Sequence, residues 1–346
     1  MRLYGRTYTR RELEAHVGRL EQVGGVRRLE GQEGVEKGVE TVHVRTGAGL
    51  EYFVNPSRGL DISLCQFRGV PLSWQAPQGD VAPAYYSDRG IDWLRTACGG
   101  LLMTCGLSQV GSPCEDGGEA LGLHGRIHHV PARQVSAQGC WEGDEYVMHV
   151  SGTLEEARLF GENLRLHRRI QSRLGGGTIV ITDRIENVGF EAVPLMLLYH
   201  FNFGFPLLEP GCELGFPAGG IEPRSAEVPL AGADRWEAPQ AGYRERVYYR
   251  SGIQAGSDGF ACASIRNPAF PGVVRGGLKV SLRWKPEQLP ELVQWKMCGE
   301  GAHVLGIEPG NCRVGGRAAE RLAGRLKYIE PGAQKVFELE LLVEEG

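Results

Sequence analysis

The 346-residue sequence lacks several features that would assign a functional class directly. No window approaches the roughly 18 apolar residues that a membrane-spanning helix needs, and the N-terminal stretch MRLYGRTYTRRELEAHVG has no apolar core typical of a signal peptide. Its 38 basic and 42 acidic residues give a formal charge of −4, so it has no bulk attraction for nucleic acid or an anionic membrane. We therefore expect a cytoplasmic protein that binds a small, neutral molecule.

Motifs for cofactors are also missing. The sequence contains no Gly-rich phosphate loop, and its nine cysteines are scattered without C-x-x-C pairs, which indicates mostly reduced thiols. We predict no metal, nucleotide or redox cofactor. One metal alternative remains, because His124 and His128 could both ligate a zinc ion. In an extended strand, however, a spacing of four residues spreads two side chains far apart.

Helical patterns are nearly absent. One segment, TRRELEAHVGRLEQVGG, is a good helical candidate, with Thr9 as N-cap and Glu12 completing a capping box. Short segments with alternating apolar and polar residues recur elsewhere, such as VETVHVRT, TIVITDRIENV and VFELELLVEE, and many of the 51 glycines separate them. This pattern predicts antiparallel sheets stacked as a sandwich rather than parallel βαβ units.

No composition shift, repeat or low-complexity run divides the chain. We therefore predict a single all-β domain over residues 1–346, with a helical lead-in over about residues 1–30. The length agrees with this, since β-sandwiches often run long as single domains. A monomer or a homodimer is expected.

A histidine at the end of an apolar run is the first candidate for chemistry. His200 follows the run LMLLY and is followed by an amide, Asn202, which could fix a sugar hydroxyl. Phe201, Phe203 and Phe205 could supply the flat apolar faces on which sugar rings stack. The alternative is a core histidine whose hydrogen bonds the backbone satisfies.

A glutamate in the segment HVLGIEPGN is the second candidate. Glu308 follows the apolar run VLGI, and glutamate is seldom buried without a partner. The alternative is a carboxylate that points to solvent from the end of a strand. Upstream, Trp295 and Lys296 could form an aromatic and hydrogen-bond donor pair for a ligand.

The segment LGLHGRIHHVPA is the third candidate. His124 and Arg126 could hold sugar hydroxyls, although a surface turn with incidental histidines is equally compatible with the pattern. In NPSRGLDIS, Arg58 and Asp61 favour an ion pair that staples a hairpin. We retain Arg58 as a further candidate for substrate binding.

Five segments, taken together, carry a resemblance to a known family: RGLDISLCQFRGVPLSW, GLLMTCGLSQVG, LGLHGRIHHVPA, LYHFNFGFP and WKMCGEGAHVLGIEPGN. In this order they resemble the aldose 1-epimerase (galactose mutarotase-like) superfamily, and more narrowly its DUF4432 branch. The resemblance extends from about residue 40 to the end of the chain. It implies a large antiparallel β-supersandwich that acts on a small-molecule sugar without a cofactor.

The resemblance also implies roles for individual residues. His200 matches the family's general acid, Glu308 its general base, and His124 a substrate-binding histidine. Two departures concern the hydroxyl contacts. The chain has MTCGL where well-studied mutarotases carry an Asn-Arg pair, and YHFNFGF where they carry NHxYFNL. The acid-base pair is therefore expected to persist while the identity of the sugar changes.

Exchange of α and β anomers needs two proton transfers. One proton leaves the anomeric hydroxyl and another reaches the ring oxygen, so the ring opens to an aldehyde and can reclose on the other face. From ordinary pKa values of about 4.3 and 6.5, we expect a Glu308 carboxylate and a readily protonated His200, on opposite sides of the C1–O5 bond. Arg126 and His124 would hold hydroxyls, and Lys296 a hydroxyl or an anionic substituent.

Two other functions remain compatible with the sequence. One is a carbohydrate-binding or sensing protein that has lost turnover, since a fold does not by itself imply a function. The other is a different carbohydrate enzyme on the same scaffold, such as a lyase, a glycosidase or an epimerase acting at another carbon. A glycosidase needs two carboxylates about 5–9.5 Å apart, and Asp61 is the only candidate for the second.

Overall fold

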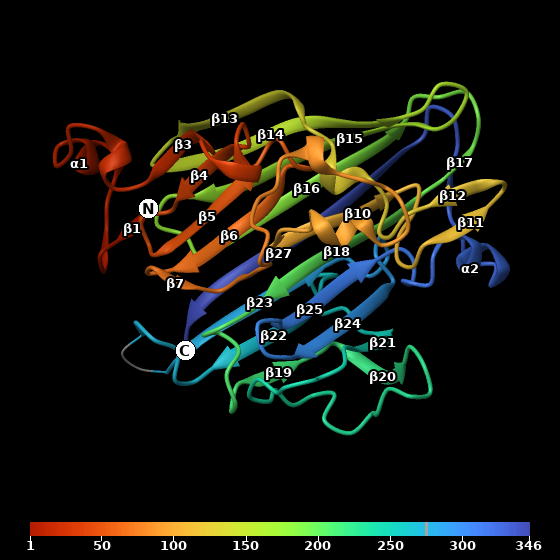
Figure 1. Cartoon of the computed structure of the whole chain (residues 1–346). Coiled ribbons are helices and arrows are strands. Elements are labelled where there is room, and N and C mark those ends of the chain that lie inside the picture. Colours follow the sequence, from red (N-terminus) through yellow and green to blue (C-terminus); the bar gives the residue numbers. More distant parts are fainter. Residues whose placement is uncertain (274–275) are drawn as a thin grey trace.

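The computed structural model describes residues 1–273 and 276–346, and two large antiparallel sheets dominate it (Figure 1). Strands account for 49% of the chain and helices for 8%. This confirms the predicted all-β fold with large antiparallel sheets. Within the described residues, every helix is too short or too polar to cross a lipid bilayer.

The larger sheet contains 11 strands in the order β20-β21-β24-β25-β18-β10-β6-β5-β4-β3, with β7 paired to β6. Its central strands come from three distant parts of the chain, so residues far apart in sequence become neighbours here. In sheet order the strands are β20 (Ala218–Pro223), β21 (Arg246–Ile253), β24 (Glu291–Cys298), β25 (His303–Gly310), β18 (Met196–Phe203), β10 (Leu102–Leu107), β6 (Asp61–Phe67), β7 (Val70–Pro71), β5 (Leu50–Asn55), β4 (Glu40–Arg45) and β3 (Gly25–Glu30).

The smaller sheet contains eight strands and packs against the larger one, because apolar side chains of both sheets form a single core. Several of its strands are long and alternate strictly between buried and less buried residues, as the sequence pattern predicts. In sheet order they are β13 (Arg133–Glu142), β14 (Glu145–Ala157), β15 (Asn163–Arg173), β16 (Thr178–Asn187), β27 (Gln334–Glu345), β23 (Leu278–Trp284), β22 (Ala261–Asn267) and β19 (Glu213–Gly215).

Short elements complete the fold. Figure 1 shows α1 at one end of the molecule and α2, beside the β11–β12 hairpin, at the other. The short strand pairs are β1 (Arg2–Leu3) with β2 (Arg6–Thr7), β8 (Trp74–Gln75) with β9 (Gly99–Gly100), β11 (Cys114–Asp116) with β12 (Glu119–Leu121), and β17 (Val193–Pro194) with β26 (Tyr328–Ile329). The helices are α1 (Arg10–Glu14), α2 (Arg317–Leu322) and five 3₁₀ turns (Leu20–Gln22, Gly34–Glu36, Pro83–Tyr85, Asp92–Arg95 and Ile127–His129).

The N-terminal helix is shorter than predicted. Thr9 and Glu12 form the expected capping box, but α1 ends at Glu14. Gly18 and Gly24 lie in the remainder of the predicted helix, where glycine is unfavourable. Residues 25–30 instead form strand β3, which pairs with β4 along its whole length. The predicted helical lead-in is therefore partly strand, because pairing with a neighbouring strand outweighs the local helical pattern.

All nine cysteines are free thiols, as the scattered spacing predicts. Five of them are buried, and burial raises the pKa of the Cys65 and Cys98 thiols. A raised pKa leaves little thiolate, so these buried cysteines are chemically inert.

The two faces of the larger sheet have different surroundings. In a strand, successive side chains point to opposite faces. The odd-numbered residues of β18 therefore join the core between the sheets: Leu197, Tyr199, Phe201 and Phe203. Of the even-numbered residues, Met196 and Leu198 join a separate apolar cluster on the outer face. His200 has the same parity as these two residues, so its ring also faces outward.

Candidate active site

A cavity of about 460 Å³ lies on the outer face of the larger sheet. This volume is in the range of small-molecule binding sites. Loop residues 76–99 and 111–124 form much of its wall, and five neighbouring strands form its floor. In the sheet order β21, β24, β25, β18 and β10, these strands contribute Val247, Val293 with Trp295, Glu308, His200 and Met103.

His200 and Glu308 lie side by side on the adjacent strands β18 and β25. The distance from His200 Nε2 to Glu308 Oε1 is 3.1 Å, and only 6% and 2% of these residues are exposed. Their proximity follows from the register, in which Phe201 pairs with Ile307. The expectation that the two groups stand on opposite sides of the C1–O5 bond is therefore wrong, since both lie on the same side of the cavity. Neighbouring strands are about 4.8 Å apart, too close to hold a sugar ring between them.

The polar atoms of this pair are not satisfied by the protein. The His200–Glu308 contact does not have hydrogen-bond geometry, and neither His200 Nδ1 nor Glu308 Oε1 has a hydrogen-bond partner among the described residues. The same holds for Trp93 Nε1 and His124 Nδ1, whose residues line the same cavity. Buried polar atoms are normally paired. Four unpaired atoms around one cavity indicate a site for a polar ligand.

The environment favours the uncharged form of both groups. Burial lowers the pKa of His200 to about 4. Burial also raises the pKa of Glu308 well above its usual range; the charge of Glu245 adds to this effect and that of Arg224 opposes it. The expectation of a carboxylate beside a protonated imidazole is therefore wrong between about pH 4 and the raised pKa of Glu308. The loss of hydration on burial is the largest cause of both shifts.

Tryptophans provide the aromatic walls of the cavity. Trp295 lies with its ring centroid 5.4 Å from that of His200 and 6.4 Å from that of Trp74. Trp93 lies 5.0 Å from the ring of His124. Flat apolar faces of this kind suit the stacking of a sugar ring. Trp295 was among the predicted residues, whereas Trp74, in the short strand β8, and Trp93, in a 3₁₀ turn, were not.

The predicted phenylalanine faces are absent from the cavity. Phe201 and Phe203 are 0% and 1% exposed and belong to the core between the sheets. Phe205 is 63% exposed and does not line the cavity. The pleat of β18 explains this result, since residues one position on either side of an outward-facing histidine must face inward.

His124 reaches the cavity from a strained position. Its φ angle is +58°, in the left-handed region of backbone conformation that residues other than glycine rarely adopt. The His124 amide donates to the Gly111 carbonyl, and the Gly106 amide donates to the His124 carbonyl, each at 3.0 Å. The His124 ring lies 5.8 Å from that of His200, and burial lowers the pKa of His124 to about 3. The two backbone hydrogen bonds thus keep His124 in a strained conformation, and its neutral imidazole lines the cavity.

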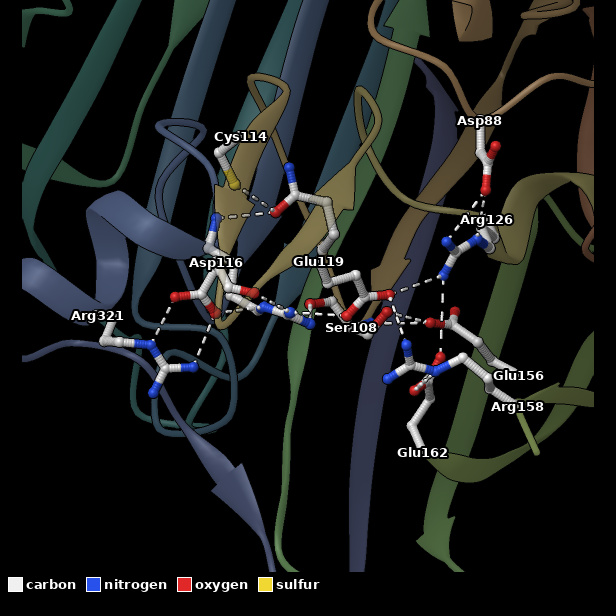
Figure 2. Close-up of polar contacts among 12 residues, drawn as sticks. Asp88, Ser108, Cys114, Asp116, Glu119, Arg126, Glu156, Arg158, Glu162 and Arg321 are labelled. Atoms are coloured by element: carbon white, nitrogen blue, oxygen red, sulfur yellow. Dashed lines mark hydrogen bonds and ion pairs between the residues drawn. The ribbon is translucent and has the colours of Figure 1, made fainter. Parts of the chain in front are cut away.

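Arg126 does not line the cavity, in contrast to the prediction that it holds a sugar hydroxyl. Figure 2 shows its guanidinium among carboxylates. It pairs with Asp88 at 3.1 Å and lies 3.8 Å from Glu119 and 3.9 Å from Glu162. Asp88 and Glu162 lie far from Arg126 in sequence and Glu119 lies just outside the motif, so the motif gave no sign of these partners.

The cluster in Figure 2 supports the segment that carries His124. Glu156 accepts hydrogen bonds from the backbone amides of Leu107 and Ser108, at 2.7 and 3.2 Å. Arg317 of α2 pairs with Asp116 at 2.7 Å. These contacts fix the chain on both sides of the turn that enters the cavity.

Lys296 also lies away from the cavity. Its neighbour Trp295 faces the cavity, so the pleat of β24 turns the lysine to the opposite face of the sheet. There the Lys296 Nζ donates to the carbonyl oxygens of Gly232 and Arg235, at 2.9 and 2.7 Å. The predicted role of Lys296 in substrate binding therefore has no geometric support.

Asn202 supports His200 rather than lining the cavity. Its Nδ2 donates to the His200 carbonyl oxygen at 3.0 Å, and the side chain is fully buried. Burial lowers the pKa of the His200 ring, and the nearby Asn202 side chain opposes this effect. The predicted contact between Asn202 and a sugar hydroxyl is thus replaced by a contact with the histidine.

Arg58 and Asp61 belong to a buried network below the cavity wall. They are joined through His128 and do not form the predicted direct ion pair. His128 Nε2 lies 2.7 Å from Arg58 Nη2, and His128 Nδ1 lies 2.6 Å from Asp61 Oδ2. Arg58 also donates to the Thr96 carbonyl at 2.5 Å. It therefore holds the loop that forms the cavity wall, and it does not reach the ligand space.

The same network argues against two alternative functions, a zinc site and a glycosidase. Both ring nitrogens of His128 are engaged, so the geometry does not support a zinc site that uses His124 and His128. Asp61 accepts hydrogen bonds from Thr104 and His128 and does not line the cavity, so it is not the second carboxylate that a glycosidase would need.

Two charged residues of the cavity were missed from the sequence. Arg224 directly follows β20 and donates from Nη2 to Ser112 Oγ at 2.5 Å. Glu245 accepts a hydrogen bond from Trp295 Nε1 at 2.9 Å. Both lie in irregular segments beside β20 and β21, where no periodic pattern or motif marks a side chain as functional.

Gly306 was missed as well. A Cβ atom at this position would lie 2.4 Å from Glu308 Oε1 and 3.2 Å from His200 Cε1. A glycine between Leu305 and Ile307 therefore leaves space for the acid-base pair. The signal in the sequence was a single glycine inside an apolar strand, which often marks a close approach of other groups.

Comparison with solved structures places this architecture in the galactose mutarotase-like fold. A protein from Klebsiella pneumoniae, provisionally named an aldose 1-epimerase, has a TM-score of 0.82 and 24% identity over 92% of this chain and 82% of its own. A galactose mutarotase-like protein from Clostridium acetobutylicum has a TM-score of 0.62 and 14% identity over 94% and 100% of the two chains. A galactose 1-epimerase from Lactobacillus acidophilus has a TM-score of 0.53 and 14% identity over 93% and 99%.

Residues 36–343 match the family described as "Domain of unknown function (DUF4432)", and the chain belongs to this family. A search of curated proteins gave no match. The family assignment agrees with the resemblance inferred from the sequence segments. At these identities, the structural neighbours establish the fold alone.

Proposed function

We propose that this protein is a carbohydrate isomerase of the aldose 1-epimerase type, which interconverts the anomers of a sugar by opening and closing its ring. The observation that carries the proposal is the buried, unsatisfied pair of His200 and Glu308 in a cavity walled by tryptophans. The names of the structural neighbours support it at the level of the fold.

The spacing of the pair suits the reacting atoms. The anomeric hydroxyl and the ring oxygen are bonded to the same carbon, so two groups on one wall, with nearest atoms 3.1 Å apart, can reach both. In the uncharged state, Glu308 carries an acidic proton and His200 Nε2 can present a lone pair. One group is then a donor and the other an acceptor before the sugar arrives, as concerted acid-base catalysis requires.

Ring opening then proceeds in one balanced step. His200 Nε2 takes the proton of the anomeric hydroxyl while Glu308 donates its proton to the ring oxygen. The C1–O5 bond breaks, C1 becomes an aldehyde carbon, and the pair becomes a carboxylate beside an imidazolium. Rotation about C1–C2 exposes the other face of the aldehyde. Reclosure returns both protons, with Glu308 acting as base and His200 as acid.

In this assignment, Glu308 carries the proton before ring opening and His200 does not, which is the reverse of the protonation that the family resemblance implies. There the histidine begins as the acid and the glutamate as the base. The two starting states differ by one proton moved between adjacent groups, and burial favours the state without charges.

Exchange NMR between α and β anomers tests the proposal, because it measures interconversion at equilibrium. A panel of aldoses is compared with and without protein. The wild type is expected to accelerate exchange of at least one sugar, and His200→Gln and Glu308→Gln are each expected to reduce that acceleration by about 10²–10⁴-fold. A matched control is His43→Gln, which disrupts another His–Glu pair at 3.1 Å outside the cavity and should leave exchange unchanged.

Wild-type rates in both cavity variants would contradict the proposal. So would a sugar that binds in the cavity without accelerated exchange for any aldose. The second result would instead favour the carbohydrate-binding or sensing function.

A further inference from the structure

A second cavity adjoins the first. It has a volume of about 740 Å³, and Arg224, Glu245 and Val247 line both cavities. The acid-base pair lies in the first cavity and does not line the second. A ligand whose anomeric carbon rests on that pair can therefore extend past Arg224 into additional space.

Positive charge gathers in this second cavity. Arg224, Arg244 and Arg246 line it, together with the carboxylates of Glu227 and Glu245. None of the three arginines forms an ion pair with another residue that the structure describes. The chain as a whole has a formal charge of −4, so this concentration of guanidinium groups is a local feature.

Arg224 stands at the junction and is held in place. Its backbone amide donates to the Val247 carbonyl at 2.9 Å, and its Nη2 donates to Ser112 Oγ at 2.5 Å. A guanidinium has five N–H donors, so most of them remain for a ligand. The positive charge of Arg224 lowers the pKa of both Glu308 and His124, so its field extends into the first cavity.

Arg246 is also restrained, since its guanidinium lies over the Tyr243 ring at 4.8 Å from the centroid. A guanidinium fixed by stacking loses less side-chain freedom when it binds an anion. Glu245 accepts a hydrogen bond from Trp295 Nε1, and the three arginines that line the second cavity outnumber its two carboxylates.

We infer that the substrate is an aldose with an anionic group at the end remote from the anomeric carbon, bound by Arg224 where the cavities meet and by Arg244 in the second cavity. This inference rests on the proposed function, which places C1 against His200 and Glu308. The opposite end of the sugar then points toward the arginines. A planar guanidinium binds the oxygens of a carboxylate or a phosphate through paired hydrogen bonds. A uronate would supply the carboxylate, and a sugar phosphate would supply the phosphate.

The test compares a neutral hexose, the corresponding hexuronate and the corresponding hexose 6-phosphate. Binding is measured by calorimetry, and anomer exchange by NMR. The wild type is expected to prefer one of the anionic sugars by at least about 10-fold at low salt, and the preference should shrink as salt rises. Arg224→Ala should reduce the ratio of anionic to neutral sugar affinity by about 10- to 100-fold. Arg244→Ala should reduce the same ratio by a smaller factor.

Arg11→Ala is the matched control, because it removes the same charge from exposed helix α1, away from both cavities. It should leave the affinity ratio unchanged. Arg224→Lys keeps the charge but loses the planar fork, so it should give an intermediate ratio. The response to the uronate and the phosphate identifies which anion is recognised.

The failure of this inference is distinguishable from failure of the proposed function. Exchange of a neutral sugar with no preference for either anionic sugar would overturn the inference and leave the isomerase proposal standing. Binding of an anionic sugar that depends on Arg224, without any exchange, would support the anion site and contradict the isomerase proposal. An equal loss of neutral and anionic sugar affinity in Arg224→Ala would also overturn the inference.

Discussion

The part of the chain that the structure describes contains two buried pairs of a histidine and a carboxylate, and their surroundings differ. His128 and Asp61 form a hydrogen bond of 2.6 Å, and Asp61 also accepts from Arg168 at 2.6 Å. His200 and Glu308 lie 3.1 Å apart without hydrogen-bond geometry, and each has an unpaired buried atom. The first pair uses its hydrogen-bonding groups within the protein, whereas the second has groups left for a ligand.

The charges of the two pairs differ in the same way. Burial raises the pKa of Asp61, but the hydrogen bond from His128 and the charge of Arg168 outweigh it, so the net pKa is lowered. Glu308 has no such partner, and its pKa is raised. Asp61 in β6 and Arg168 in β15 belong to different sheets, so this ion pair joins the two layers. One pair therefore serves the fold, and the other is available for chemistry.

Breaking the structural pair should have the largest effect on stability. Asp61→Asn removes one of the two carboxylates that pair with buried Arg168, the other being Asp183, and it also removes the charged acceptor of His128. It is expected to lower the free energy of unfolding by about 3 kcal/mol. Urea unfolding measures this loss. Glu308→Gln is the paired variant and should show no comparable loss at neutral pH. Equal losses in the two variants would remove the distinction between the pairs.

The pH dependence of stability separates the pairs further. The pKa of folded His200 is about 4, below its ordinary value of 6.5, so the unfolded chain binds more protons between these values. The wild type should therefore lose stability relative to His200→Gln as pH falls from about 6.5 to about 4, by up to about 3 kcal/mol. Glu308 has the opposite sign: its raised pKa makes the wild type lose stability relative to Glu308→Gln as pH rises above about 4.5.

Urea unfolding at a series of pH values checks both signs. His16→Gln, at an exposed position of the N-terminal segment, serves as the control. Stability curves for His200→Gln and Glu308→Gln that stay parallel to the wild-type curve would show that neither group is perturbed by burial.

Crowding the functional pair should reduce activity with little effect on the rest of the sheet. Gly306→Ala places a methyl group against Glu308 and His200 and is expected to lower anomer exchange by about 10- to 100-fold. Gly219→Ala in β20 of the same sheet is the control, because nothing lies within 4 Å of its added Cβ. If both variants retain full exchange, the close approach at Gly306 has no catalytic importance.

The smallest effect is expected at the strained histidine. His124→Gly relieves a left-handed backbone conformation and should raise stability by about 1 kcal/mol while weakening sugar binding. Gln134→Gly relieves similar strain outside the cavity, at φ +55°, and should raise stability without changing binding. Calorimetry of unfolding and of ligand binding gives both readings. Unchanged sugar binding in His124→Gly would remove its role in the site.

The sequence predicts the fold well because the apolar residues of its alternating segments are the residues that are buried in the strands. Strands such as β16 alternate between buried and less buried residues along their whole length. The N-terminal segment shows the limit, since its capping box formed but strand pairing converted residues 25–30 to β3. Propensity is local, whereas pairing partners come from elsewhere in the chain.

The candidate site could be predicted in part. His200, Glu308, His124 and Trp295 line the cavity, and all four lie in segments that carry the family resemblance. The other predicted binding residues do not line it, because strand parity or distant partners decide their positions: Asn202, Lys296, Arg58 and Arg126. Residues that enter from irregular segments gave no signal: Trp93, Arg224 and Glu245.

The protonation state of Glu308 decides whether the acid-base pair is uncharged, and its measurement does not require the natural substrate. Carbon-13 NMR of the glutamate carboxyl groups, with Glu308→Gln to assign the resonance, gives the pKa of this one group. We expect Glu308 to titrate well above the ordinary pKa of 4.5, with its acidic proton retained next to a neutral His200. Titration at or below 4.5 would show a carboxylate in the cavity and would contradict the uncharged acid-base pair on which the mechanism depends.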